Sequence, residues 1–292
     1  MAETDVQRDQ PTAEIFEVGP RDGLQNERRM IPTANKVALV DILSTAGFRR
    51  IEVASFVSPK WVPQMADAAE VLAKIVRAPG VRYAALTPNM RGLDGARAAK
   101  ADEIAVFASA SEGFSRANIN CSVAEAIARF TPVMAAARDS GLSVRGYISC
   151  VTDCPFDGPV DPGAVATLAA QLWALGAYEI SLGDTVGRGT PETVSAMLDA
   201  VLGAVPADHL AGHFHDTAGR ALDNIDVSLD RGLRVFDASV GGLGGCPYAP
   251  GASGNVATEA VLDLLAARGF DAGLDPDAVL RAAEYAKGLR DG

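Results

Sequence analysis

The chain has 292 residues, and 48% of them are hydrophobic, so it has enough apolar material for a large core and is not a disordered chain. Its 37 acidic residues outnumber its 26 basic residues and give a formal net charge of −11, which excludes broad electrostatic binding to nucleic acid. No run of 18 apolar residues is present, so the chain is not expected to cross a membrane.

Residues 1–12 form an acidic, polar segment at the N-terminus. The segment has neither the apolar stretch of a secretory signal nor the Arg-rich amphipathic pattern of a transit peptide. The chain contains only four cysteines, too few for a disulfide framework and typical of reduced intracellular thiols. We therefore predict a flexible tail over residues 1–12, a single catalytic domain over residues 13–292 and a cytoplasmic location.

Short β-rich runs recur along the whole chain. Eight of them are typical of β-strands, and each is followed by a segment with helical character. The expected strands are Glu14–Val18, Arg50–Ala54, Arg82–Leu86, Glu103–Phe107, Val144–Ser149, Tyr178–Leu182, Leu210–His215 and Val235–Ser239.

The helical segments carry recognisable start and stop signals. Several begin with Ser, Asp-Pro or Thr-Pro and end at Gly, the asymmetry expected of capped helices. The expected helices are Pro32–Ala46, Ser122–Ser140, Asp161–Leu175, Thr190–Leu202, Asp216–Asp230 and Gly254–Arg268, with Pro276–Leu289 as one further C-terminal helix.

Strands that alternate with helices imply a parallel sheet. Eight such units in one chain favour an α/β fold of the closed (β/α)8 TIM-barrel type, here a single domain with an additional C-terminal helix. The alternative is an open Rossmann-like sheet. That fold requires a G-x-G-x-x-G turn after the first strand, and the first strand here runs into the different sequence VGPRDG at residues 18–23.

A TIM barrel carries its functional residues at the C-terminal ends of its strands. His213 and His215 stand at that end of the seventh strand, and their spacing of two directs both imidazoles to the same side. Two of the three histidines in the chain occur here. This pair predicts a shared ligand; the alternative is two polar side chains that are satisfied by hydrogen bonds at the barrel opening.

Asp22 follows the first strand, and Asn255 follows the Gly-rich loop after the eighth. Together with the two histidines they form a mixed nitrogen and oxygen set, which suits Mg²⁺ or Mn²⁺ better than structural zinc. Four protein ligands leave about two octahedral positions, which a β-hydroxy acid could fill. The alternative for both residues is helix capping, a common role of Asp and Asn.

Two more carboxylates and one thiol are candidates for chemistry. Glu52 lies in the second strand, where the alternative is an ion pair with Arg21 or Lys60. Asp184 follows the sixth strand, where the alternative is a helix cap. Cys246 lies in a Gly-dense loop, and this setting fits a thiol that a lid brings over a bound substrate.

Several blocks of distinctive sequence cover the chain from about residue 14 to about residue 265. They are EVGPRDGLQNE at 17–27, SFVSPKWVPQM at 55–65, NINCS at 118–122, SLGDT at 181–185, HDT at 215–217, and the loop GLGGCPYA at 242–249 with GASGN at 251–255. In combination these blocks resemble the 3-hydroxy-3-methylglutaryl-CoA lyase family. The resemblance implies a metal-dependent barrel enzyme that cleaves its acyl-CoA substrate to acetyl-CoA and acetoacetate.

The resemblance also implies roles for individual residues, with Mg²⁺ or Mn²⁺ as the cofactor and a homodimer as the assembly. Arg21 would stabilise an enolate, and Cys246 would act from the lid. The implied metal ligands are Asp22, His213, His215 and Asn255. The implied catalytic residues are Arg21, Cys246, Glu52, Asp184 and His213, and the expected substrate contacts are Arg21, Ser55, Tyr147, Ser181 and Thr185.

Three departures from the family pattern bear on the acyl group. Gly113 stands where a bulkier residue is usual, Asp153 stands where a small residue is expected, and Ala218 and Arg220 replace other residues after the HDT block. A different 3-hydroxyacyl-CoA is therefore an alternative substrate.

Three other functions remain as alternatives. A Claisen-condensing synthase of the same superfamily lacks the Cys-Pro-Tyr lid. A ferrous oxygenase would use two His and one Asp as its metal triad. A scaffold without activity is disfavoured because every expected polar group is present.

Overall fold

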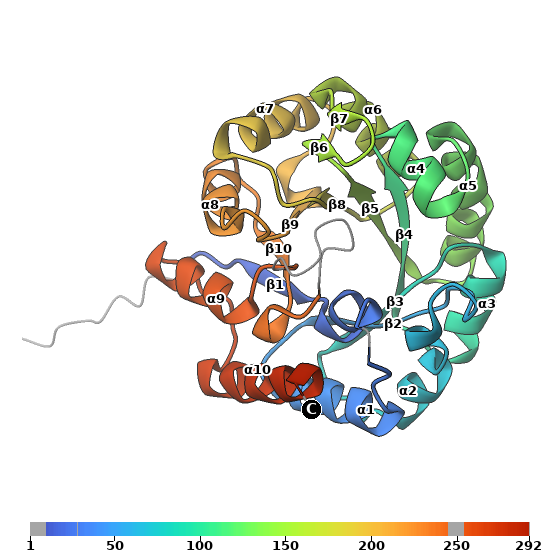
Figure 1. Ribbon diagram of the computed structural model, residues 1–292, viewed down its shortest axis with the longest axis vertical. Helices are drawn as coiled ribbons and strands as arrows, with labels where there is room; N and C mark the ends of the chain where they lie inside the picture. The colour runs from blue at the N-terminus through green and yellow to red at the C-terminus, as the bar shows by residue number, and fades with distance from the viewer. Residues whose placement is uncertain (1–9, 28, 245–253, 292) are drawn as a thin grey trace, which may run out of the picture.

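The computed structural model describes residues 10–27, 29–244 and 254–291. Eight parallel strands close into a barrel in the order β1-β10-β9-β8-β5-β4-β3-β2, and helices surround them (Figure 1). The predicted TIM barrel is confirmed. The barrel strands are β1 (Glu14–Glu17), β2 (Arg50–Ser55), β3 (Arg82–Leu86), β4 (Glu103–Ser109), β5 (Ser143–Ser149), β8 (Glu179–Asp184), β9 (Leu210–Phe214) and β10 (Val235–Ala238).

The helices expected from capping signals are present. Ser122 forms a capping box at the start of α5, because its N–H donates to the Glu125 carboxylate at 2.7 Å and its hydroxyl accepts from the Glu125 N–H at 3.2 Å. These helices are α1 (Thr33–Ser44), α5 (Val123–Asp139), α6 (Pro162–Ala174), α7 (Pro191–Leu202), α8 (Ala221–Asp230), α9 (Thr258–Ala267) and the additional C-terminal helix α10 (Pro276–Asp291).

Two of the predicted helix starts were wrong. Helix α8 begins at Ala221 and not at Asp216, and α9 begins at Thr258 and not at Gly254. The skipped residues pair with each other, because the Asp216 N–H donates to the Gly254 carbonyl at 2.7 Å. The Asp216 carboxylate also accepts from the Ala221 N–H at 3.1 Å. These residues therefore join two loops at one end of the barrel before either helix starts.

Several short elements were not expected as separate units. A two-stranded antiparallel hairpin follows β5 and consists of β6 (Asp153–Cys154) and β7 (Gly158–Pro159). The single turns are the π-helical η1 (Gly19–Gly23) and the 3-10 turns η2 (Pro63–Met65), η3 (Ala207–His209) and η4 (Val240–Gly242). The short helices are α2 (Ala68–Lys74), α3 (Met90–Ala98) and α4 (Glu112–Ile119).

The side-chain period of two gives the strands an outer face that packs against the helices and an inner face that turns into the lumen. On β2, Ile51 and Val53 pack into the main core against the helices. Arg50 and Glu52 point the other way and reach residues of β8 and β5 across the lumen. The barrel lumen is therefore lined by charged side chains and not only by the branched aliphatic residues common in this fold.

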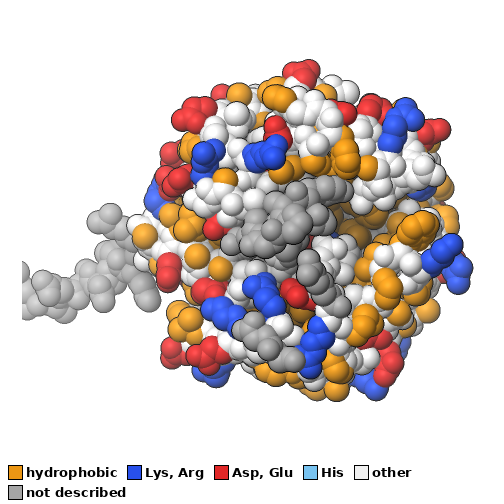
Figure 2. Space-filling view, in the orientation of Figure 1, with side chains coloured by type: hydrophobic (Ala, Val, Ile, Leu, Met, Phe, Trp, Pro, Cys, Tyr) orange, Lys and Arg blue, Asp and Glu red, His pale blue; other side chains and the backbone are white. Residues whose placement is uncertain are grey.

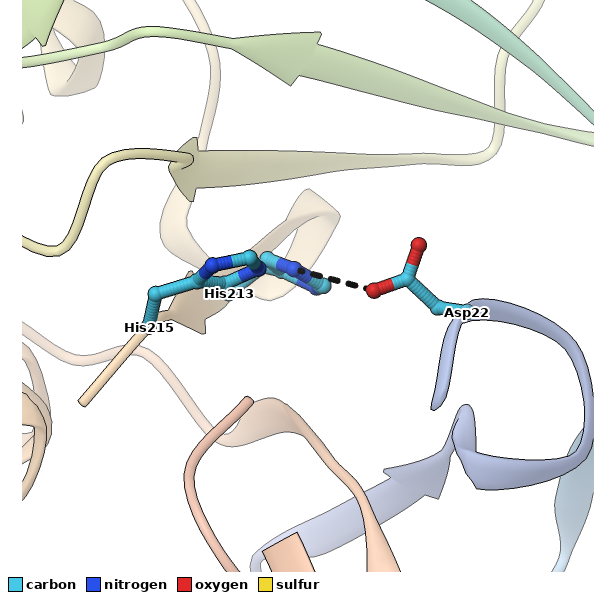
Figure 3. Close-up of side chains that lie close together, drawn as sticks. All are labelled: Asp22, His213 and His215. Atoms are coloured by element: carbon cyan, nitrogen blue, oxygen red, sulfur yellow. Dashed lines mark ion pairs between the residues drawn. The ribbon is translucent and has the colours of Figure 1, made fainter. Parts of the chain in front are cut away.

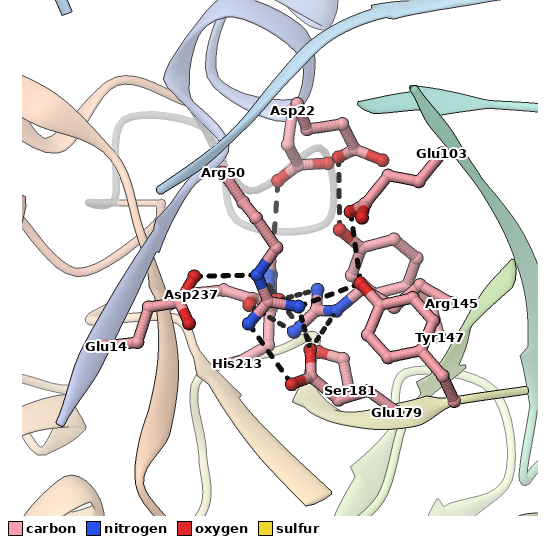
Figure 4. Close-up of polar contacts among 12 residues, drawn as sticks. Glu14, Asp22, Arg50, Glu103, Arg145, Tyr147, Glu179, Ser181, His213 and Asp237 are labelled. Atoms are coloured by element: carbon pink, nitrogen blue, oxygen red, sulfur yellow. Dashed lines mark hydrogen bonds and ion pairs between the residues drawn. The ribbon is translucent and has the colours of Figure 1, made fainter. Parts of the chain in front are cut away.

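Charged lumen residues at the N-terminal ends of the strands form a compact ionic cluster, here called the floor group (Figure 4). Arg145 lies between two carboxylates, bonding Glu179 at 2.6 Å and Asp237 at 2.7 and 2.9 Å. Arg50 of β2 extends the cluster, because it bonds Glu14 of the neighbouring β1 at 2.6 Å and Glu179 of β8, across the lumen, at 3.0 Å. The floor group consists of Glu14, Arg50, Glu103, Arg145, Glu179 and Asp237.

Among the described residues, no helix is both long and apolar enough to cross a membrane. The residues predicted as a tail are described from Gln10 onward. The Pro11 carbonyl accepts from the Asp271 N–H at 3.0 Å, and Thr12 forms a β-bridge with Asp271.

Candidate active site

Asp22, His213 and His215 lie together at the C-terminal ends of the strands (Figure 3). Asp22 comes from η1, His213 from β9, and His215 directly follows β9. One possible ligand atom from each residue lies within 4.8 Å of the others, and His213 Nε2 is 4.0 Å from Asp22 Oδ2. The spacing of the two histidines, the strand ends and the family resemblance had all pointed to this grouping.

The backbone of η1 places Asp22 at this point. The N–H groups of Arg21, Asp22 and Gly23 all converge on the Val18 carbonyl at 2.7–3.2 Å, which turns the chain sharply after β1. π-helical turns of this kind often occur at functional sites. Gly23 is required because a Cβ there would lie 2.7 Å from the Leu243 Cβ. The turn therefore presents two consecutive charged side chains toward the lumen.

Asn255 is held next to the histidines by backbone pairing. It forms an isolated antiparallel bridge with His215, and its Nδ2 donates to Asp22 Oδ2 at 2.9 Å and to the Leu243 carbonyl at 3.3 Å. The amide nitrogen thus faces Asp22. A metal-binding role needs the amide oxygen at this place, which a half-turn of the amide would provide.

Asp22 and His215 both have lowered pKa values, for different reasons. Burial alone would raise the pKa of Asp22, but the charge of Arg21 and the nearby imidazoles outweigh it and lower that pKa to about 2. Burial and the neighbouring His213 lower the pKa of His215 to about 4. At neutral pH the site therefore offers an ionised carboxylate and at least one neutral imidazole.

These residues fit a divalent cation. His215 Nδ1 is buried and has no hydrogen-bond partner among the described residues, which is costly unless the atom binds something else. Adjacent ligands of an octahedral Mg²⁺ at about 2.1 Å lie about 3 Å apart, so the cluster needs only a modest contraction. The mixture of imidazole nitrogen and carboxylate oxygen suits Mn²⁺ and Mg²⁺ as well as softer ions.

Arg21, Glu52 and Tyr147 form a second buried group beside the first. Arg21 bonds Glu52 Oε2 at 2.5–2.6 Å and Asp22 Oδ1 at 2.5 Å. Its guanidinium lies 5.5 Å from the centre of the Tyr147 ring, and the Tyr147 hydroxyl donates to Glu52 at 3.2 Å. Burial raises the pKa of Glu52 although Arg21 opposes it. Glu52 Oε1 is buried without a described partner. The two groups together form the mouth group: Arg21, Asp22, Glu52, Tyr147, His213, His215 and Asn255.

Asp184 is not part of the mouth group. Its carboxylate accepts from the Thr152 hydroxyl at 3.0 Å and the Gly189 N–H at 2.8 Å, and it is fully buried. These bonds support the loop between β8 and α7. The geometry therefore matches the structural alternative considered for Asp184, although the carboxylate caps a loop and not the first turn of α7.

The other expected substrate contacts have mixed surroundings. Ser55 Oγ is buried and has no hydrogen-bond partner among the described residues. The Ser181 hydroxyl is fully buried and donates to Asp237 at 2.8 Å, and Thr185 Oγ1 accepts from the Cys150 N–H at 2.9 Å. Cys246 lies outside the described residues. Gly244 is the last described residue before it. A Cβ at Gly244 would lie only 2.9 Å from Asn255 Nδ2, so this position leaves no room for a side chain.

Two of the three departures from the family pattern, at Gly113 and Asp153, lie at the β6–β7 hairpin. A Cβ on Gly113 would lie 2.3 Å from Asp157 Oδ1, so the glycine makes room for Asp157 to accept from the Gly113 N–H and the Ser111 hydroxyl, both at 2.7 Å. Asp153 forms an exposed ion pair with Arg188 at 3.3 Å. Both departures thus have structural partners on the hairpin or the loop beside it.

Sequence reasoning missed the residues directly below the mouth group. His213 Nδ1 lies 3.1 Å from Asp237, and Arg145 holds Asp237 in turn. The available signal was the period of two, because charged residues recur at the inward positions of β2, β5 and β10. The predicted site drew mainly on polar residues at strand ends, whereas Arg145 and Asp237 lie within their strands.

On the face seen in Figure 2, Lys and Arg side chains are interspersed with Asp and Glu side chains.

Comparisons with known proteins give a consistent result. The sequence profile of the HMGL-like family matches residues 12–285. A 3-hydroxy-3-isohexenylglutaryl-CoA/hydroxy-methylglutaryl-CoA lyase of Pseudomonas aeruginosa is 56% identical over 270 residues, which cover 92% of this chain and 90% of that protein.

Solved structures extend the likeness to the whole fold. The HMG-CoA lyase from Brucella melitensis is 63% identical, with a TM-score of 0.96 over 97% of this chain and 100% of that chain. An HMG-CoA lyase from Acinetobacter baumannii, solved with coenzyme A and 3-methylmalate, is 37% identical, with a TM-score of 0.90 over 96% of this chain and 91% of that chain.

Proposed function

The chain belongs to the HMGL-like family, and from this premise we propose that it is a carbon–carbon lyase that cleaves 3-hydroxy-3-methylglutaryl-CoA to acetyl-CoA and acetoacetate. The observation that carries the proposal is the position of Asp22. One oxygen of its carboxylate bonds Arg21 at 2.5 Å, and the other lies 4.0 Å from His213 Nε2. A single residue thus joins the candidate metal ligands to a buried cation suited to stabilising an enolate.

We propose that Asp22, His213, His215 and Asn255 hold Mg²⁺ or Mn²⁺. A divalent cation bound there would act as a Lewis acid toward oxygen atoms of the substrate. The chain's own contribution is to keep these side chains in place, with Asp22 ionised and His215 neutral at physiological pH.

Glu52 is our candidate for the base that takes the proton of the tertiary hydroxyl. Its Oε1 has no described partner, and burial raises its pKa toward the range in which a general base is effective. The C2–C3 bond then breaks, its electron pair moves to C2, and the C3 oxygen becomes a ketone. The former C2 leaves as a thioester enolate with negative charge on its oxygen.

Arg21 is our candidate for stabilising this enolate oxygen. Its guanidinium is fixed by Glu52 and Asp22 and is buried, so its charge acts at short range without reorganisation. Cys246 is retained as the proposed donor of the proton that converts the enolate carbon into the methyl group of acetyl-CoA.

The test is a coupled assay for acetyl-CoA released from 3-hydroxy-3-methylglutaryl-CoA. We expect cleavage with Mg²⁺ or Mn²⁺, a loss of about 100-fold or more with EDTA, and full recovery when Mg²⁺ is restored in excess. A folded protein that binds Mn²⁺ but releases no acetyl-CoA would contradict the proposed substrate. Activity that survives exhaustive chelation would contradict the metal site.

A second substrate is suggested by the Pseudomonas aeruginosa relative, whose name includes 3-hydroxy-3-isohexenylglutaryl-CoA. The same assay with both thioesters gives the ratio of their kcat/KM values. We expect kcat/KM to be higher for 3-hydroxy-3-methylglutaryl-CoA. A higher kcat/KM for the isohexenyl thioester would assign the chain to the longer acyl group.

Assembly and location are also proposals. The described cysteines Cys121, Cys150 and Cys154 are free thiols, as expected in a reducing compartment, and we propose a cytoplasmic location. We propose a homodimer on the family resemblance, and sedimentation velocity would test it.

A further inference from the structure

Asp237 touches His213 because of the strand register. The two residues are paired across the neighbouring strands β10 and β9, and period-two alternation directs both side chains into the lumen. His213 Nδ1 lies 3.1 Å from Asp237 Oδ2. Figure 4 shows this contact, in which His213 of the mouth group meets Asp237 of the floor group.

The Asp237 carboxylate is held by several partners at once. Arg145 binds it with both terminal nitrogens, at 2.7 Å to Oδ1 and 2.9 Å to Oδ2. The Ser181 hydroxyl donates to Oδ2 at 2.8 Å. The carboxylate is almost completely buried, so neither its charge nor its orientation changes easily.

An ionised carboxylate has only acceptor sites, so the imidazole must donate. In neutral His213 the proton therefore sits on Nδ1, and Nε2 carries the free lone pair. Nε2 is the atom that lies 4.0 Å from Asp22 Oδ2. His215 differs, because its Nδ1 has no partner among the described residues.

We propose that Asp237 is a positioning residue for the metal site: it fixes the tautomer and ring orientation of His213 so that the Nε2 lone pair faces the cation. This inference rests on the proposed function, because it assumes that His213 binds the metal. It assigns to Asp237 a task beyond the neutralisation of Arg145 in the floor group.

Asp237→Asn separates the two tasks. The neutral amide no longer holds the imidazole proton on Nδ1 by charge. Arg145 contacts both oxygen positions of residue 237, and Ser181 shares Oδ2 with His213, so either the amide oxygen or the NH2 group can face Nδ1. The tautomer and ring orientation of His213 are then no longer fixed, and the Nε2 lone pair is less available to the cation. An equivalent Asp→Asn change in the serine-protease triad leaves the geometry intact and acts through the wrong histidine tautomer.

The matched control is Glu179→Gln. Glu179 also bonds Arg145, at 2.6 Å, and the change removes the same buried negative charge without any contact to His213. Mn²⁺ affinity is measured for both variants by titration calorimetry. We expect about 10- to 100-fold weaker binding for Asp237→Asn and less than about 3-fold change for Glu179→Gln. Equal affinities in the two variants would overturn the inference.

A measurement on the unaltered protein covers the case in which Asp237→Asn fails to fold. The chain has three histidines, so ¹⁵N spectra of the imidazoles are simple to assign with single His→Gln variants. In metal-free protein at alkaline pH, where the imidazole is neutral, we expect His213 with its proton on Nδ1. A proton on Nε2 would overturn the inference. Absence of Mn²⁺ binding in the unaltered protein would instead contradict the proposed metal site.

Discussion

The floor group and the mouth group lie in the same barrel lumen but differ in how completely their buried polar atoms are paired. In the floor group, Glu14, Glu179 and Asp237 bond Arg50 or Arg145 at 2.6–3.0 Å. Glu103 forms an ion pair with Arg82 at 3.1 Å, although its Oε2 has no hydrogen-bond partner among the described residues. In the mouth group, Glu52 Oε1 and His215 Nδ1 are buried without described hydrogen-bond partners. The largely paired floor group fits a structural role, whereas the open atoms of the mouth group fit a site that is completed by a cation and a substrate.

The titration of two buried carboxylates makes the same contrast. Burial alone would raise the pKa of Asp237, but Arg145 lowers it well below the ordinary range. Glu17, on the outer face of β1, accepts only from neutral donors: the N–H groups of Gly19 and Val240 and the Thr258 hydroxyl. Burial therefore prevails and raises the pKa of Glu17 to about 7. For these two carboxylates, the bidentate contact with Arg145 lowers the pKa of Asp237, whereas the neutral donors around Glu17 do not overcome its burial.

The largest expected effect on stability comes from the floor group. Arg145→Met leaves Asp237 and Glu179 with one cation fewer in a buried site, and we expect a loss of about 3–5 kcal/mol in the free energy of unfolding. Urea denaturation measures it. Lys74→Met, which breaks an exposed pair with Glu70, is the control and should change stability by less than about 1 kcal/mol. Equal losses in both variants would remove the distinction between buried and exposed pairs.

The largest expected effect on activity comes from the mouth group. Arg21→Lys replaces a planar, two-carboxylate fork with a single ammonium group, and we expect the barrier to rise by about 3–4 kcal/mol, as for one lost oxyanion donor. The measurement is kcat of the cleavage reaction, with circular dichroism to verify folding. Near-normal kcat in Arg21→Lys would refute the proposed enolate role.

A smaller effect on stability is expected at Glu17, whose buried carboxylate has no arginine or lysine partner among the described residues. Its folded pKa of about 7 lies above the ordinary value of 4.5, so unfolding releases a proton between these pH values and stability falls as the pH rises through about 7. We expect the stability of the parent protein relative to Glu17→Gln to drop by up to about 3 kcal/mol from pH 4.5 to pH 8. Urea titrations across this range measure the difference, and a flat profile would show that Glu17 is ionised when folded.

The smallest expected effect lies outside the lumen. Gly113→Ala places a Cβ against Asp157 and displaces the bonds at the start of α4, so we expect about 1 kcal/mol of lost stability. Gly288→Ala is the matched control, because that helical position has no atom within 4 Å of the new Cβ and should gain about 0.5–1 kcal/mol. Thermal unfolding of the two variants should shift in opposite directions. If both variants unfolded at a higher temperature than the parent protein, Asp157 would be able to move away from the new Cβ at little cost.

Local signals in the sequence determined the architecture and the core of the candidate site. Periodicity and capping residues determined eight strands and the main helices, because both depend on neighbours within a few residues. The spacing of His213 and His215 determined that they share a side, and barrel geometry brought Asp22 to the same end. The helix starts at Asp216 and Gly254 failed because those residues pair with each other across the fold.

Only the tertiary structure decided which charges meet. Arg21 and Glu52 are 31 residues apart, and Arg145 and Asp237 are 92 residues apart. Their contacts follow from strand order and register, which no local pattern in a single sequence specifies. The same register sets Asp237 beneath His213 and leaves Asp184 bonded to a loop. The residue types were visible in the sequence, but their pairing arose from the closure of the barrel.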